Sequence, residues 1–169
     1  MTQYNSYSGI ILSIEDILID SRDTLGCNKL FTIQDSDNNI ITFHVTPSTY
    51  FIDNITAKEG DLVTGFYDNN APVPLIYPPR FRTLIMAVGL NDVNVKVDFF
   101  NRNLVSSDGL LRLNISPNTQ ITLENGQSFY QNPSNRNLIV LYGPTTRSIP
   151  AITTPYKIIV LCGREREKH

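Results

Sequence analysis

Two stretches of the sequence, residues 38–52 and 108–122, follow one pattern. Each begins with a pair of turn-forming residues, continues with alternating apolar and polar residues, and reaches the pattern Val/Ile, Thr/Ser, Pro, any residue, Thr. The opening pairs, Asn-Asn and Asp-Gly, suit the positive φ of a tight hairpin turn, and the alternation has the period of a half-buried strand. An internal repeat constrains a chain strongly, because each copy has to form the same supersecondary unit.

Three further matches follow in the same order in both halves of the chain. They are an apolar strand-like segment, a P-x-I-x-x-P pattern followed by an aromatic residue and a cation, and a last apolar segment that ends in glycine. We expect the prolines to bend the connection before the last strand, and Ile76 and Ile152 to fill the core. The matched residues are 62–67 with 137–142, 74–79 with 150–155, Phe81-Arg82 with Tyr156-Lys157, and Gly89 with Gly163.

The repeat divides the chain into a first unit at residues 7–90 and a second unit at residues 91–163. Short segments rich in β-branched and aromatic residues, bounded by turn-formers, predict about five strands in each unit and no amphipathic helix. The sequence therefore predicts an all-β protein, built as a tandem duplication of two small five-stranded OB-like Greek-key barrels. A β-sandwich or one continuous sheet remains the alternative. The charged tail, residues 164–169, is expected to fray.

The run from Glu59 to Thr83, EGDLVTGFYDNNAPVPLIYPPRFRT, carries a resemblance to a known family. It resembles a β-domain of uncharacterised proteins from clostridia and related Gram-positive bacteria, in which G-D-x-V-x-G-[FY]-[YF]-D precedes Y-P-P-x-[FY]. The resemblance covers mainly the first unit and brings no established activity; it implies a bacterial, often surface-associated β-module. The second unit departs from the pattern, with Val140 at the place of Gly65 and Thr153-Thr154 at the place of Tyr77-Pro78.

The residues that catalysis and metal binding need are scarce in this sequence. Only two histidines occur, His44 in a predicted strand and His169 in the tail, and no motif pairs a nucleophile with a base. Residues 35–39 have the D-x-D-x-N spacing that opens an EF-hand loop, but Ile40 stands where that loop requires glycine. We interpret these residues as a hairpin turn, and we expect no enzyme activity, no cofactor and no metal site.

The best candidate for a binding site is the proline-rich loop of the first unit. Aromatic and arginine side chains of this kind can stack on ligands or pair with anions. A second cluster of the same type contains Phe99, Phe100 and Arg102. The absence of tryptophan excludes a tryptophan-lined sugar platform. The candidate loop residues are Tyr77, Pro78, Arg80, Phe81 and Arg82.

The overall charge favours a protein partner over a nucleic acid. The formal net charge is −2 and the pI is about 5.6, so no basic excess attracts phosphate. We therefore expect a non-catalytic structural or interaction protein that self-associates or binds a protein partner, with OB-type binding of an oligosaccharide or single-stranded nucleic acid as the alternative. Cys27 and Cys162 stand in different units and are a possible disulfide, within one chain or between chains.

The ends and apolar runs of the chain bear on its location. No apolar run has the length of a membrane span, and the N-terminal residues lack the pattern of a signal peptide. The expectation is a soluble protein without membrane insertion, found in the cytoplasm or, by a route that the sequence does not encode, on a spore or cell surface.

Overall fold

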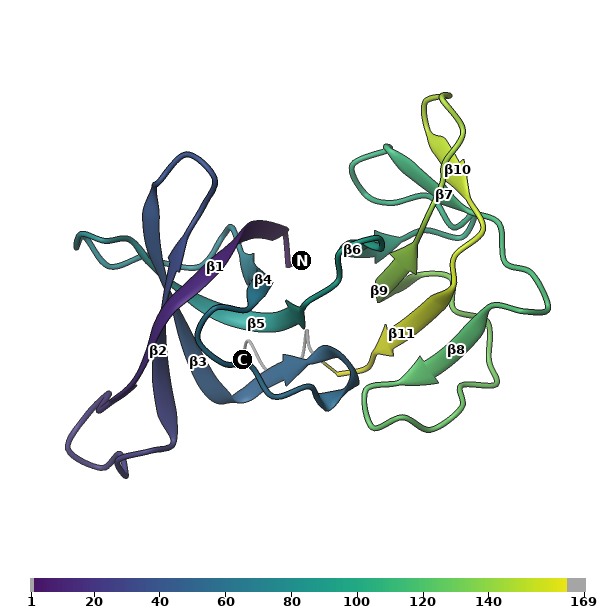
Figure 1. The fold of residues 1–169 in the computed structure, drawn as a ribbon. Coiled ribbons are helices and arrows are strands. Elements are labelled where there is room, and N and C mark those ends of the chain that lie inside the picture. The colour runs from purple at the N-terminus through teal and green to yellow at the C-terminus, as the bar shows by residue number, and fades with distance from the viewer. Residues whose placement is uncertain (1, 164–169) are drawn as a thin grey trace. The chain divides into compact units, whose positions relative to one another are not determined.

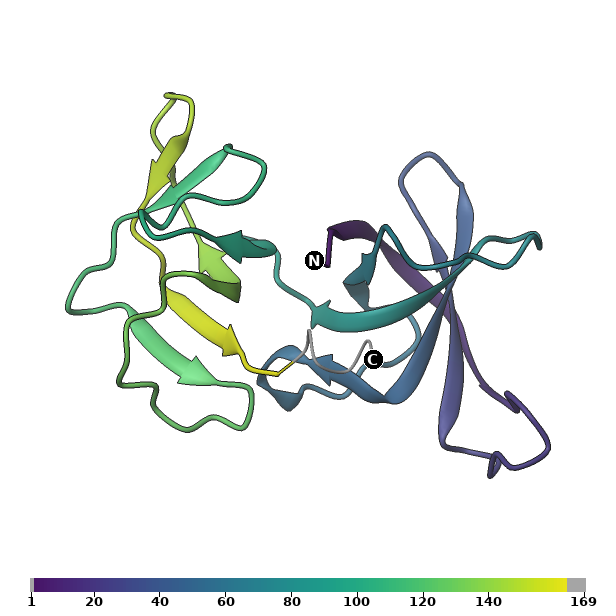
Figure 2. The same cartoon turned by 180° about the vertical axis from the view of Figure 1, so that it is seen from behind.

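A computed structural model describes residues 2–163 of the chain, which form an all-β structure (Figures 1 and 2). The described chain divides between Leu90 and Asn91 into two compact units. We call residues 2–90 the N-terminal unit and residues 91–163 the C-terminal unit. The prediction for the tail falls on residues 164–169, which lie outside the described residues.

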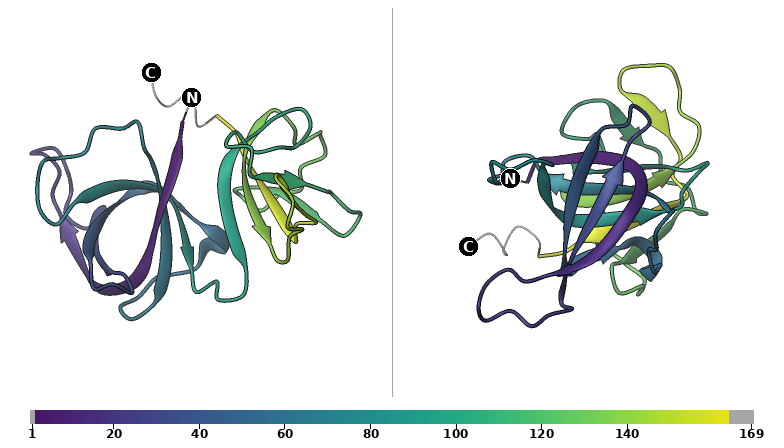
Figure 3. Two further views of the ribbon diagram at one scale, coloured as in Figure 1. Left: turned by 90° about the horizontal axis from the view of Figure 1, so that it is seen from above. Right: turned by 60° about the vertical axis from the view of Figure 1, so that its left-hand side comes forward.

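The N-terminal unit is a closed five-stranded barrel in which the strands follow the order β1-β2-β3-β5-β4 (Figure 3, left). The β3–β5 pair is parallel and the other pairs are antiparallel. This arrangement is the Greek-key barrel of OB type that the sequence predicts. The strands are β1 (Tyr4–Ile17), β2 (Asn28–Gln34), β3 (Ile40–Phe51), β4 (Leu62–Asp68) and β5 (Arg80–Val88), with a 3-10 turn, η1, at Ile52–Asn54.

Close packing around Phe43 sets the shape of this barrel. Phe43 is fully buried, and a Cβ atom on Gly65 would lie 2.6 Å from its ring. The glycine in β4 therefore makes room for the phenyl ring of β3. The buried core around this contact consists of Ile11, Phe31, Ile33, Ile41, Phe43, Val45, Val63, Met86 and Val88.

The C-terminal unit repeats this pairing pattern without closing the barrel. Its four-stranded sheet has the order β6-β9-β11-β8, which corresponds to β1-β4-β5-β3, and the remaining pair is β10-β7. The counterpart of β2 is reduced to isolated bridges at Val105 and Ser106. The second five-stranded barrel predicted from the sequence is therefore not closed: the described residues of this unit form a four-stranded and a two-stranded sheet. Its strands are β6 (Asn94–Phe100), β7 (Leu111–Leu113), β8 (Gln120–Leu123), β9 (Arg136–Tyr142), β10 (Ala151–Thr153) and β11 (Lys157–Leu161).

Strand register corrects part of the repeat alignment. Phe43 pairs with Phe81, and Leu113, its counterpart in the C-terminal unit, pairs with Thr153. Thr153, and not Tyr156, is therefore the counterpart of Phe81. The same offset makes Pro150 the counterpart of Pro78, and both prolines follow cis peptide bonds.

The expectation that two isoleucines plug the core is wrong. Ile76 is 48% exposed and Ile152 is 37% exposed. The P-x-I-x-x-P patterns start at positions that do not correspond in the fold, so their likeness does not reflect a shared packing role.

A small turn within the repeat forms identically in both units. The Thr49 hydroxyl accepts a hydrogen bond from the Thr46 amide at 3.0 Å and donates one to the Thr83 carbonyl at 2.7 Å. The Thr119 hydroxyl accepts from the Ser116 amide at 3.2 Å and donates to the Pro155 carbonyl at 2.9 Å. The repeated Thr/Ser-Pro-x-Thr pattern thus has a structural role. Its last threonine ties the turn to β5 in the N-terminal unit and to Pro155, between β10 and β11, in the C-terminal unit.

Both units also tie the first strand to the hairpin turn that precedes β3 or β7. The Tyr7 hydroxyl donates to Asp35 at 2.6 Å, and Lys96, the counterpart of Tyr7 by strand register, donates to Asp108 at 2.6 Å. Burial and the neighbouring Asp35 carboxylate raise the pKa of Tyr7 to about 12. Asp35 also accepts from the amides of Asp37 and Asn39, which confirms the predicted hairpin turn.

Candidate functional site

The N-terminal barrel presents an outer face formed by β2, β3 and β5. Side chains alternate along a strand, so the residues between the buried core positions point away from the barrel interior. Arg80 pairs with Thr42 and Arg82 with His44, which places two arginines beside the outward side chains of β3. The face formed by strands 2 and 3 is the usual ligand side of an OB-type barrel. We define the outer face by Asn28, Leu30, Thr32, Thr42, His44, Thr46, Arg80 and Arg82.

Two long loops lie at opposite ends of this face, residues 18–27 between β1 and β2 and residues 69–79 between β4 and β5. Both loops expose large apolar side chains. Leu75 is fully exposed and Tyr77 is 84% exposed. Loops with this much exposed apolar surface are candidates for contacts with another molecule. The exposed apolar residues are Leu18, Ile19 and Leu25 in the first loop and Val73, Leu75, Ile76 and Tyr77 in the second.

The structure separates the five candidate residues of the proline-rich loop. Tyr77 and Pro78 lie in the loop, whereas Arg80 and Arg82 lie on β5 and flank the outer face. Phe81 packs against the barrel core and stacks on Tyr67, with ring centroids 4.3 Å apart. Phe81 is therefore a core residue, and it does not form a ligand platform beside Tyr77. The sequence contains a sign of this arrangement. Side chains alternate along β5, so Phe81, between Arg80 and Arg82, points to the opposite side of the sheet from both arginines.

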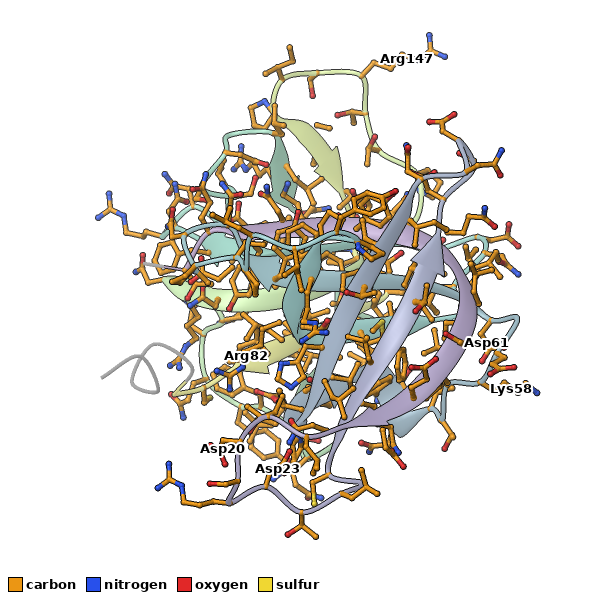
Figure 4. The ribbon with its side chains drawn as sticks, turned by 90° about the vertical axis from the view of Figure 1, so that its left-hand side faces the viewer. Asp20, Asp23, Lys58, Asp61, Arg82 and Arg147 are labelled. Carbon is orange, nitrogen blue, oxygen red and sulfur yellow. The ribbon has the colours of Figure 1, made fainter. Side chains whose placement is uncertain are left out.

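A polar pocket of about 500 Å³ lies where the outer face meets the loop of residues 18–27. Asp20 and Asp23 line it from the loop, and Arg82 lines it from β5; Figure 4 shows these three side chains at one end of the barrel. Asp23 accepts hydrogen bonds from the Ile19 amide at 2.9 Å and from the Asn28 side chain at 3.1 Å. Much of the loop's carboxylate charge is therefore used to hold the loop itself in place.

His44 lies in the same pocket, half-buried on β3. Its Nε2 atom lies 2.9 Å from Asn28 Oδ1, within hydrogen-bond distance. Burial, followed by the charges of Arg82 and Arg80, lowers the pKa of His44 below its ordinary value, and Asp23 opposes this shift. Burial and the two arginines therefore disfavour the charged form of His44.

A second, mainly apolar pocket of about 460 Å³ opens at the mouth of the N-terminal barrel. Phe31 and Val45 form its buried floor, and the chain between β3 and β4 contributes Ile55 and Ala57 to its rim. The helical residues of this connection are the 3-10 turn at Ile52–Asn54. The sequence does not predict this pocket, because the pocket is the volume that the chain between β3 and β4 leaves unfilled. The full lining is Ile14, Cys27, Lys29, Phe31, Val45, Thr46, Thr49, Tyr50, Phe51, Asn54, Ile55, Thr56 and Ala57.

The remaining candidates have structural roles or stand apart. Phe100 is fully buried in the core of the C-terminal unit, so it cannot join Phe99 and the exposed Arg102 in a surface site. Cys27 and Cys162 are both exposed, free thiols. Among residues 2–163, no group of three or more His, Cys, Asp or Glu side chains is placed to hold a metal ion. Nor does that part of the chain contain a helix long and apolar enough to cross a membrane.

The comparisons with known proteins assign no family to this arrangement. No protein-family model matches the chain, and no curated protein matches it.

Proposed function

We propose that this chain is a non-catalytic interaction protein whose N-terminal barrel binds a protein partner through its two long loops. The observation that carries the proposal is the exposed apolar surface of residues 69–79, above all Leu75 and Tyr77. Exposed apolar groups gain free energy when a partner covers them, and aromatic side chains are enriched at protein interfaces.

The C-terminal unit supports the assignment to the N-terminal unit. The two units share their strand order and their repeated turn, so these common features serve the fold. The first long loop has a counterpart of only a few residues, between Phe100 and Val105. Features that one copy has and the other lacks are the natural candidates for function. The resemblance of residues 59–83 to a clostridial surface module supports a location on a bacterial cell or spore surface.

The alternative ligand is an oligosaccharide or a single-stranded nucleic acid on the outer face. Arg80 and Arg82 favour it by their charge. Asp20 and Asp23 share the polar pocket with Arg82, and Phe81 faces the core, so a nucleic acid would meet mixed charge and no outward row of aromatic rings. We therefore rank this alternative below a protein partner.

A variant with a polar loop tests the proposal. Val73, Leu75 and Tyr77 are changed together to serine, and the tagged full-length chain is recovered from cells that naturally produce it. Because all three side chains are exposed, the thermal midpoint should stay unchanged, while recovery of a bound protein, or of a second copy of the chain, should fall about tenfold or more. Ile149→Ser is the matched control, since Ile149 is 88% exposed in the corresponding loop of the C-terminal unit. Equal recovery by the wild type and the polar-loop variant would contradict the proposal.

A further inference from the structure

The two units differ in the side chain that packs against the core at the place of the N-terminal barrel-mouth pocket. Both units connect their third and fourth strands across this region, through residues 52–61 in the first and 124–135 in the second. In the first unit, Ile52 at the start of this connection is buried, Ala57 packs against the core, and the pocket of about 460 Å³ remains beside Ala57. In the second unit, Phe129 packs against the core.

The structure shows how the C-terminal unit holds Phe129 in this position. The segment around it pairs with β8 through an isolated antiparallel bridge between Thr122 and Ser128. The Leu123 amide donates to the Gln127 carbonyl at 2.8 Å, and the Phe129 amide donates to the Ile121 carbonyl at 3.1 Å. The Arg136 guanidinium lies 4.9 Å from the centre of the phenyl ring. An extended segment and one aromatic side chain therefore fill this part of the unit.

Strand register places the two regions in correspondence. Ile121, which accepts the hydrogen bond from Phe129, is the counterpart of Phe51 by the repeat and by the pairing of both strands with the last strand of their unit. Phe51 lines the pocket of the N-terminal unit and lies next to Phe31, with ring centroids 6.3 Å apart. Phe129 thus lies beside Ile121. The counterpart of Ile121 in the N-terminal unit is Phe51, which lines the pocket.

We infer that the barrel-mouth pocket of the N-terminal unit accepts an aromatic side chain from an extended segment of a partner protein, as Phe129 fills the C-terminal unit. The inference rests on the proposed protein-binding function and names one part of the contact. The volume of the pocket lies in the range typical of ligand sites, and barrel mouths are a common place for them. The lining is mainly aromatic and aliphatic, and it includes Asn54 and Thr56, whose polar side chains can meet the backbone of a bound segment.

Peptide binding to the full-length chain tests the inference. The probe is a peptide with the sequence of residues 125–131, NGQSFYQ, and its control carries alanine in place of phenylalanine. Methyl resonances of Ile14, Val45, Ile55 and Ala57 report on the pocket, and we expect saturable shifts with the probe. The alanine peptide should bind about tenfold more weakly or worse, because it cannot bury the ring.

A plugged variant supplies the second arm. Ala57→Phe brings into the first unit the type of residue that fills the second, so the peptide-induced shifts of Val45 and Ile55 should disappear while the thermal midpoint is retained. Ala57→Ser is the matched control and should bind like the wild type. Absent shifts at millimolar peptide, equal affinity of the two peptides, or unchanged binding by Ala57→Phe would overturn the inference. Tighter binding of octanoate than of the probe would also overturn it, in favour of a pocket for small lipids.

The experiments distinguish a failure of the proposed protein-binding function from a failure of the pocket inference. The polar-loop variant keeps every pocket residue, so it should bind the probe peptide normally even where it loses its partner. Partner recovery that depends on the loop, together with no peptide binding in the pocket, would leave the protein-binding function standing and remove only this inference.

Discussion

Thr49 and Thr119 carry the most exact likeness between the two units. Each hydroxyl accepts one hydrogen bond from the turn and donates one to a backbone carbonyl, that of Thr83 in β5 or that of Pro155 between β10 and β11. Both residues are partly buried, so a lost partner is only partly replaced by water. The repeated pattern in the sequence therefore marks a contact that ties the turn to a later segment of its unit, and the proline within it only shapes the turn.

Valine substitutions should destabilise both units by similar amounts. Thr49→Val and Thr119→Val keep the shape of the side chain and remove both hydrogen bonds, so each should lower the free energy of unfolding by about 2 kcal/mol. Urea denaturation monitored by NMR, with resonances from each unit, measures the two effects separately. Ser48→Ala, in the same turn but exposed, should change the stability by less than about 0.5 kcal/mol. A loss in one unit only would mean that the two turns are not equivalent.

At the scale of elements, the two units pack the same pair of strands with side chains of different size. Phe43 on β3 fills the space left by Gly65 on β4. The corresponding residues of the C-terminal unit are Leu113 and Val140, both buried in its core. A smaller residue on one strand thus accompanies a larger one on the other, as expected when total core volume is conserved.

A double-mutant cycle tests this compensation. Gly65→Val should destabilise the N-terminal unit by about 3 kcal/mol or more, because its side chain overlaps the Phe43 ring. Phe43→Leu alone should cost about 1–2 kcal/mol through the space that it leaves. The double variant, which copies the C-terminal pair, should be more stable than the sum of the single effects by at least about 1 kcal/mol. Additive losses would show that the two positions do not exchange volume.

The sequence predicted the positions of the strands better than their pairing register, and it did not predict the pocket that the side chains leave open. Alternation located the five strands of the first barrel, and hairpin residues located the turns at Asn38 and Gly109. The break of the last C-terminal strand at Pro155 shifted the repeat alignment, because local motifs do not reveal how strands pair. The pocket beside Ala57 was out of reach, since an unfilled volume depends on side chains from four separate segments.

At the scale of the whole molecule, the described chain contains two compact units with similar strand pairing. Among residues 2–163, only the N-terminal unit closes its barrel, and this unit carries the long loop of residues 18–27 and the pocket at the barrel mouth. In the C-terminal unit, isolated bridges stand in place of most of one strand, and Phe129 packs against the core. We interpret the C-terminal unit as mainly structural and the N-terminal unit as the one that binds.

Site-specific photo-crosslinking tests this division of labour most directly. A benzophenone amino acid is placed at Leu75 in the N-terminal unit or at Ile149 in the corresponding loop of the C-terminal unit, and the full-length chain is irradiated in cells that naturally produce it. Both positions are highly exposed, so collisions alone would label both equally. We predict a discrete protein adduct from position 75 that is absent from position 149. Equal labelling from both positions, or adducts from position 149 alone, would contradict the assignment of binding to the N-terminal barrel.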